Sequence, residues 1–198
     1  MRGKAFSPDL RSRCEGAVFA NIAMPHSELF STILAAFRAA GWNYSEVEGR
    51  EVIRAGFEAH HTRVELHVQA FERLATVSVV AESPEMTEDP TKRERLTELA
   101  MRVNQTLTVG NFEINWDDGR MYFRCTNLFP DPQGNAEIIQ GMVHNTVGEM
   151  DRMAPLVAIL HRTEGPDLAA LSIEALLEQD DLIPEVPVPK SGDSAAGK

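Results

Sequence analysis

The stretch VGNFEINWDDGRMYFRC, residues 109–125, constrains the possible fold of this chain more than any other. The stretch consists of a glycine, a segment in which apolar and polar residues alternate, an Asp-Asp-Gly turn and a second segment of the same kind. Asp-Gly between two alternating segments is among the strongest local signals of a β-hairpin. Because alternate side chains of a strand share a face, we expect Phe112, Ile114 and Trp116 to bury together against a helix. The hairpin predicts an antiparallel sheet with one buried face.

Three further segments have the composition of strands. They are EVIRAGFEA (51–59), RVELHVQAF (63–71) and ATVSVVAES (75–83), separated by short breaks. The second alternates apolar and polar residues, and the third is rich in β-branched residues and apolar enough to be central. Together with the hairpin, these segments predict an antiparallel sheet of five strands.

Two helices are predicted around this first group of strands. Apolar residues recur at helical spacing in PHSELFSTILAAFRAAGW (25–42), with Ser27 as N-cap and Gly41 as the residue that ends the helix. A second helical stripe lies in the segment 83–112, after a turn-rich linker, and we expect Gly110 to end that helix.

A long third helix is predicted from Ala136 to His161, where apolar residues keep a helical period. Pro155 lies well inside it and should kink or divide it, because proline has no N–H donor and crowds the preceding turn. DLAALSIEALLEQ (167–179) predicts a short fourth helix. The order α-β-β-β-α-β-β-α indicates an α+β fold, with helices covering one face of the five-stranded sheet.

The chain is short enough for one domain with extensions. We expect an N-terminal arm over residues 1–24 and the α+β domain over residues 25–162. The short C-terminal helix should occupy residues 163–180. The last segment, 181–198, is rich in Pro, Gly, Ser and charge, which predicts a disordered tail.

Charge and apolar content exclude two classes of partner. The net charge is −11, whereas nucleic-acid binding through phosphates needs clustered Lys and Arg; the one dense basic stretch, KRER (92–95), is interrupted by Glu94. No window approaches the roughly 20 apolar residues of a membrane span. The two cysteines, Cys14 and Cys125, form no Cys-x-x-Cys pair, so we expect a reduced, cytoplasmic protein.

The sequence offers little support for catalysis, a cofactor or a metal. His60 and His61 end one strand and His67 lies on the next, with Glu58 or Glu65 as a further ligand, but nothing brings three ligands together. NWDDGR fits a tight turn better than a calcium loop. Serine-elbow, Walker and dinucleotide glycine motifs are absent from the sequence. We therefore expect a non-enzymatic protein with no cofactor and no metal.

Two groups of residues could form an interaction surface. Aromatic and Arg side chains of the hairpin are of the types enriched at interfaces, and methionines of the third helix could provide an adaptable apolar surface, although ordinary core is the simpler interpretation of them. The residues of this possible surface are Trp116, Tyr122, Arg124, Met142, Met150 and Met153.

Three motifs resemble the YbjN-type family of bacterial proteins, often described as sensory-transduction regulators. They are AAGWNYSEVEG (39–49), RVNQTLTVGNFEINWDDGRMYFRC (102–125) and VHNTVGEMDRMAPLVAIL (143–160), the last containing Asp151. The resemblance extends from Met24 to Leu160. It implies a fold similar to the type III secretion chaperones, an α+β sandwich that commonly dimerises and binds extended partner segments. It implies no catalytic residues.

The hairpin is on this basis mostly architectural. Asn111 allows a sharp entry into its first strand, and we expect Asn104 to brace the corner between helix and strand through hydrogen bonds to backbone.

The leading hypothesis is a cytoplasmic adaptor- or chaperone-like homodimer that binds another, unidentified polypeptide. Its acidic charge favours basic or amphipathic partner segments, held in a groove or at an open sheet edge. The predicted C-terminal helix could occupy that groove in the free protein. A small-molecule sensor with a pocket between the sheet and the long helix is the alternative, and an enzyme of unrecognised type ranks last.

Overall fold

The computed structural model describes residues 26–178. The predicted arm (1–24) and tail (181–198) therefore lie outside the described residues.

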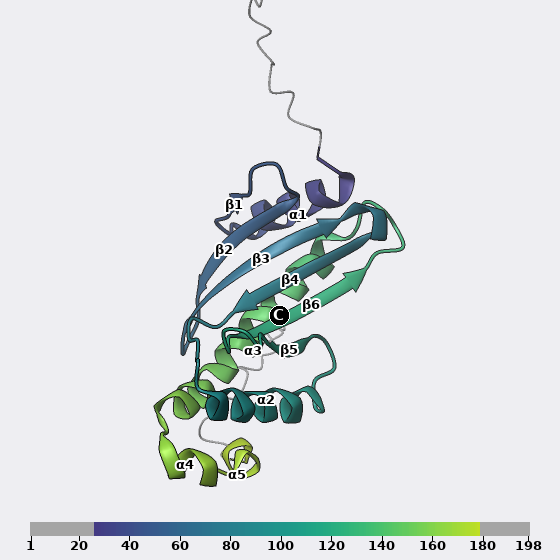
Figure 1. The fold of residues 1–198 in the computed structure, drawn as a ribbon. Coiled ribbons are helices and arrows are strands. Elements are labelled where there is room, and N and C mark those ends of the chain that lie inside the picture. Colours follow the sequence, from purple (N-terminus) through teal and green to yellow (C-terminus); the bar gives the residue numbers. More distant parts are fainter. Residues whose placement is uncertain (1–25, 179–198) are drawn as a thin grey trace, which may run out of the picture.

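The core of the fold is one antiparallel sheet of six strands in the order β1-β2-β3-β4-β6-β5 (Figure 1). The strands are β1 Ser45–Glu46, β2 Val52–Glu58, β3 Arg63–Phe71, β4 Thr76–Glu82, β5 Asn111–Ile114 and β6 Met121–Leu128. The α+β class and the antiparallel sheet are confirmed. The predicted number of five strands is wrong, because β1 is a sixth.

Strand β1 carries no pattern from which it could be predicted. It consists of Ser45 and Glu46, both exposed, which pair with Arg54 and Ile53 of β2. The chain reverses between the two strands at Gly49, whose φ of +70° is one that glycine adopts without steric cost. Two exposed residues show neither alternation nor an apolar face, so only the pairing itself defines the strand.

The first helix matches its prediction, whereas the second ends earlier than expected. Helix α1 spans Glu28–Ala40, with Ser27 accepting a hydrogen bond from the Phe30 N–H and Gly41 in the left-handed conformation at its end. Helix α2 spans Pro90–Asn104, so Gly110 does not end it. Gly110 instead permits a close approach: at φ +81°, a Cβ there would lie 2.4 Å from Cζ of Phe123.

The long third helix is continuous through its proline. Helix α3 spans Ala136–Arg162 and contains Pro155, so the proline does not divide it. The predicted fourth helix is two short helices, α4 Gly165–Ala170 and α5 Ile173–Leu177. Leu171 is extended between them, and the Ser172 side chain accepts from the Ala175 N–H, which starts a new helix.

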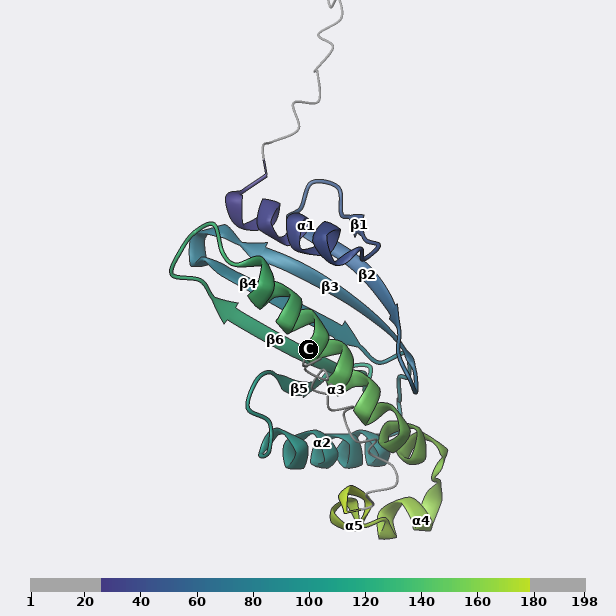
Figure 2. The ribbon, with the colours of Figure 1, turned by 180° about the vertical axis from the view of Figure 1, so that it is seen from behind.

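Helices α1 and α3 pack on one face of the sheet, and no helix of residues 26–178 lies over the opposite face (Figures 1 and 2). Helix α2 packs beside β5 at the edge of the sheet, and α4 and α5 pack against α2. The large side chains with the least exposure come from α1, α2, α3 and the inner sheet face. They include Phe30, Phe37, Ile53, Leu96, Leu99, Phe123, Ile139, Met153 and Leu156. The prediction that helices cover one face is confirmed.

Candidate interaction site

The hairpin buries two of the three residues predicted to pack inward and exposes the third. Phe112 is buried and its ring lies 4.8 Å from that of Phe123, and Ile114 packs against the same core. Trp116 is 59% exposed, so the prediction that it buries against a helix is wrong. Strand β5 ends at Ile114, and the turn begins where the Asn115 carbonyl accepts from the Gly119 N–H at 2.8 Å. Trp116 therefore lies outside the strand, and the alternation of side chains along the strand does not determine the direction of its side chain.

Trp116 is held in place although it is exposed. The Arg93 guanidinium of α2 donates to the Trp116 carbonyl at 2.6 Å and lies 5.5 Å from the centre of its ring. The same guanidinium donates to the Glu88 carbonyl at 3.1 Å. A cation over an indole face is attracted by its π electrons. Arg93 thus ties the hairpin loop to the loop before α2 and fixes the indole at the surface.

The loop before α2 lies directly against the hairpin loop. The Thr87 N–H donates to the Asp118 carbonyl at 3.0 Å, and a Cβ at Gly119 would lie 2.3 Å from the Thr87 carbonyl oxygen. Met86, on this loop, is 56% exposed. We call the following residues of the two loops the Trp116 surface: Met86, Glu88, Trp116, Asp117 and Asp118. It combines two exposed apolar side chains with three carboxylates.

Tyr122 and Arg124 lie elsewhere, on the sheet face that no described helix covers. Arg124 donates to both carboxylate oxygens of Glu113 on β5, at 2.8 and 3.0 Å. This hydrogen bonding holds the pKa of Glu113 below its usual value and raises the pKa of Arg124. The three hairpin residues predicted as one interaction surface are therefore divided between the turn and the uncovered face.

The three predicted methionines are in the core. Met142 and Met150 are 5% exposed and Met153 is 1% exposed, because α3 directs them toward the sheet. They form no free surface in this structure, which corrects that part of the prediction and favours the core interpretation.

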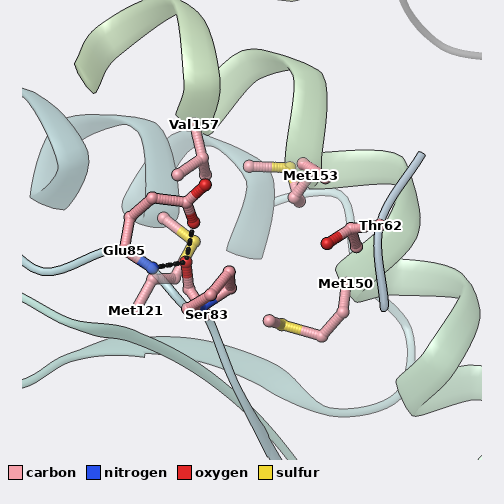
Figure 3. A pocket seen from close by; sticks show the side chains of 9 residues that line it. Thr62, Ser83, Glu85, Met121, Met150, Met153 and Val157 are labelled. Carbon is pink, nitrogen blue, oxygen red and sulfur yellow. Dashed lines mark hydrogen bonds between the residues drawn. The ribbon is translucent and has the colours of Figure 1, made fainter. Parts of the chain in front are cut away.

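Met150 and Met153 line a small cavity between α3 and the sheet, where a sensor pocket was expected (Figure 3). Met121 and Ser83 lie on its other side, and the Ser83 hydroxyl donates to Glu85 at 2.7 Å. The cavity volume is about 20 Å³, which is room for about one water molecule. Small-molecule sites usually occupy about 300 Å³ or more.

The outer edge of β5 is closed by a side chain. The Asn104 amide donates to the Phe112 carbonyl at 3.0 Å and accepts from the Phe112 N–H at 2.8 Å, which confirms the predicted brace. A partner strand would need these same two backbone groups. The predicted open sheet edge is therefore unavailable at Phe112 of β5. At the other edge of the sheet, the pairing of β1 with β2 extends only as far as Arg54.

Two carboxylates suggested as metal ligands, Glu58 and Glu65, form ion pairs with an arginine. Arg63 binds Glu58 at 2.9 Å and Glu65 at 2.6 Å, and residues 26–178 hold no group of three or more His, Cys, Asp or Glu placed to bind a metal. Burial, together with the nearby Arg124, lowers the pKa of His67. Burial raises the pKa of Cys125, which makes it a poor nucleophile.

Asp151, which lies in the closing motif of the sequence, holds a turn. Its carboxylate oxygen accepts from the backbone N–H groups of His61 and Thr62 at 2.6 and 3.1 Å. Sequence reasoning did not identify this role, because the contact joins residues 90 positions apart.

Comparison with known proteins places these features in a family. A family model named YbjN, described as "Putative bacterial sensory transduction regulator", matches residues 30–158. A crystal structure of YbjN from E. coli, titled "a putative transcription regulator", is similar with 14% identity, a TM-score of 0.48, and coverage of 67% of this chain and 92% of that one. None of the curated proteins matches the chain. Among the described residues, no helix is both long and apolar enough to cross a membrane.

Proposed function

Because the chain belongs to the YbjN family, we propose that it is a regulator that binds another polypeptide, in the manner of an adaptor or chaperone, and catalyses no reaction. The observation that carries the proposal is the fixed, exposed indole of Trp116, which is 59% exposed and held by Arg93. Tryptophan and arginine are the residue types most enriched among those that dominate binding energy at protein interfaces. An anchor that is already ordered also loses little conformational entropy on binding.

The charge of the Trp116 surface indicates the partner's chemistry. Glu88 lies two residues from Met86 in the sequence, and Asp117 and Asp118 directly follow Trp116. Complementary charge favours and orients encounter between partners. The partner is thus a segment that carries Lys or Arg beside apolar residues. A partner nucleic acid is not part of the proposal, since its phosphates would meet a protein of net charge −11.

The proposal also includes homodimerisation, a fold of the type III secretion chaperone type and a location in the cytoplasm. The uncovered sheet face supports homodimerisation, since such a face can take a second subunit. The antiparallel sheet with helices on its other face agrees with the proposed type of fold. The buried free thiol of Cys125 agrees with a reducing compartment. The small-molecule alternative has less support, because a cavity of about 20 Å³ would have to open more than tenfold to hold a metabolite.

A binding experiment with a defined probe tests the partner chemistry. The full chain is titrated into a fluorescently labelled amphipathic peptide of Lys and Leu, with a peptide of Glu and Leu for comparison. We expect binding of the Lys peptide, loss of that binding in Trp116→Ala, and retention in Met101→Ala. Met101 is the matched control, because it is also 59% exposed but lies on α2. Equal binding by Trp116→Ala would contradict the proposal.

A pull-down from native cell extract with the same three proteins then tests the natural partner. A protein captured by the wild type and Met101→Ala but not by Trp116→Ala supports the proposal. Proteins captured equally by all three baits count against it.

A further inference from the structure

The outer edge of β2 is paired over only part of its length. Strand β1 pairs with β2 as far as Arg54, which lies opposite Ser45, and in Figure 1 it lies beside one end of β2 only. From there to Glu58, no strand of residues 26–178 pairs with this edge. The cause lies just before β1, where the Trp42 N–H donates to the Phe37 carbonyl of α1 at 3.0 Å. This bond holds the chain at the end of α1, so β1 begins only at Ser45.

The strand register identifies the backbone groups that this open edge offers. The Ala59 N–H donates to the Thr62 carbonyl at 3.0 Å, in continuation of the register between β2 and β3. Hydrogen-bonded and non-hydrogen-bonded pairs alternate along an antiparallel ladder. The odd-numbered residues of β2 therefore bond to β3, whereas Gly56 and Glu58 direct their N–H and C=O groups to the outer edge. None of the hydrogen bonds within residues 26–178 uses these four groups.

Gly56 makes the open edge accessible to another backbone. It is exposed, and since it has no side chain, the exposed surface is backbone. A Cβ at this position would lie 2.7 Å from Oε1 of Glu65 and 2.9 Å from a guanidinium nitrogen of Arg63, so these two side chains take the space that a side chain would need. A glycine within a strand often marks the close approach of another backbone. At the opposite edge of the sheet, by contrast, Asn104 takes both backbone groups of Phe112.

An aromatic cluster lies beside the open edge, on the side of the sheet that carries α1 and α3. The Trp42 ring lies 5.4 Å from that of Phe57 on β2, 5.1 Å from that of His144 on α3 and 5.1 Å from that of Phe37 on α1. Trp42 and Phe57 are partly exposed, and His144 is exposed. An added strand would therefore find an apolar surface on this side of the sheet.

We propose that an extended segment of another polypeptide adds to this edge as a short antiparallel strand, bonded to the backbone of Gly56 and Glu58. In strand addition, backbone hydrogen bonds supply affinity and the sites for alternate side chains supply specificity. The partner residue opposite Phe57 faces the same side of the sheet as Phe57, because successive side chains of a strand alternate between the faces. A large apolar residue fits there, since it covers the rings of Phe57 and Trp42.

The partner residue opposite Glu58 is Lys or Arg. It faces the other side of the sheet, where Arg63 binds both Glu58 and Glu65, at 2.9 and 2.6 Å. One arginine against two carboxylates leaves one negative charge in excess, and the Glu58 side chain is 76% exposed. A basic partner residue balances that charge, and it sets the orientation of the added strand.

Peptides with a methylated backbone test the strand addition. The chain has two tryptophans, so the tryptophan fluorescence of full-length Trp116→Phe reports Trp42 alone. This variant is titrated with a capped peptide in which Val alternates with Lys and Thr, and we expect a saturable change in fluorescence. Methylation of the Lys and Thr backbone nitrogens, which face β2, should weaken binding by about tenfold or more, because it removes hydrogen-bond donors. Methylation of the Val backbone nitrogens, which point away from β2, should leave binding unchanged.

A charge reversal on β2 tests the orientation of the added strand. Glu58→Lys, in the Trp116→Phe background, should weaken binding of the Lys peptide and strengthen binding of a peptide with Glu in place of Lys. Glu48→Lys is the matched control, because it changes the net charge equally but lies in the turn between β1 and β2. Equal effects of the two variants would contradict a contact at Glu58.

The possible failures are distinguishable. This inference rests on the proposed binding of another polypeptide but not on the Trp116 surface. A Trp42 fluorescence that millimolar peptide does not change, or an equal affinity for the two methylated peptides, overturns strand addition. A fluorescence that changes with protein concentration and not with peptide assigns the edge to a second copy of the chain, and it also overturns the proposal. If the Lys and Leu peptide still binds through Trp116, only this inference fails, whereas the proposed function fails with it if neither peptide binds. Thermal unfolding of every variant verifies that the fold is retained.

Discussion

The side chain of Asn104 forms, with Phe112, the pair of hydrogen bonds that a neighbouring strand would form. Its Nδ2 donates to the Phe112 carbonyl and its Oδ1 accepts from the Phe112 N–H, at 3.0 and 2.8 Å. The last residue of α2 thereby closes the edge of the sheet. An edge strand with free backbone groups is a template for aggregation, so the contact stabilises the fold and also limits unwanted pairing.

We predict that Asn104→Ala lowers the free energy of unfolding by about 2 kcal/mol, because it leaves two backbone groups of Phe112 without a partner. Urea unfolding at equilibrium measures the loss. Asn104→Asp should recover part of it, since a carboxylate oxygen can still accept from the N–H. Gln105→Ala is the neighbouring control, as no described side-chain hydrogen bond involves Gln105. An unchanged midpoint in Asn104→Ala would show that water replaces both bonds at no cost.

The limits of prediction from sequence follow from the range of the interactions involved. Alternation and turn residues are local signals, and they were enough to predict the strands β2 to β6 and the helix-covered face. Strand β1 is defined only by its pairing with β2, and the contact between Asp151 and the β2–β3 turn joins residues 90 positions apart. Local patterns contain no information about such pairing.

The candidate site was harder to predict than the fold. Trp116 continues an alternating pattern, but its backbone already belongs to the turn. The spacing of the methionines places them on one face of α3, but it does not show whether that face is exposed or buried. The position of the sheet against α3 makes it a buried face.

We predict that Asp151→Ala destabilises the β2–β3 turn by about 1–3 kcal/mol, because the backbone N–H groups of His61 and Thr62 lose a charged acceptor. Hydrogen exchange should become faster at these two residues first. Asp151→Asn keeps an acceptor oxygen and should have a smaller effect. The matched control is Asp167→Ala on α4. Exchange that accelerates equally along the whole chain would contradict a local role.

We predict that the ion pair of Glu113 and Arg124 makes stability dependent on pH below neutrality. The Arg124 hydrogen bond lowers the pKa of folded Glu113 below its ordinary value of 4.5. The unfolded state therefore takes up a proton first, and the pair's contribution is present above pH 4.5 and lost as the pH falls through the lower folded pKa. Urea unfolding between pH 7 and pH 3 should show a smaller loss of stability in Glu113→Gln than in the wild type. Equal losses in the two proteins would assign the pH dependence to other carboxylates.

We predict that removing α4 and α5 destabilises the domain and exposes an apolar surface on α2. Leu168, Ile173 and Leu176 are at most 4% exposed, in helices that pack against α2. Burial of a large aliphatic side chain contributes about 2 kcal/mol, so deletion of residues 165–198 should cost several kcal/mol and increase binding of a hydrophobic dye. Deletion of residues 179–198 alone is the control, and the difference between the two truncations measures the contribution of α4 and α5. If these helices occupy a partner groove, the longer deletion should also bind the Lys and Leu peptide more tightly. Unchanged stability and unchanged peptide affinity together would show that α4 and α5 neither support the domain nor compete with a partner.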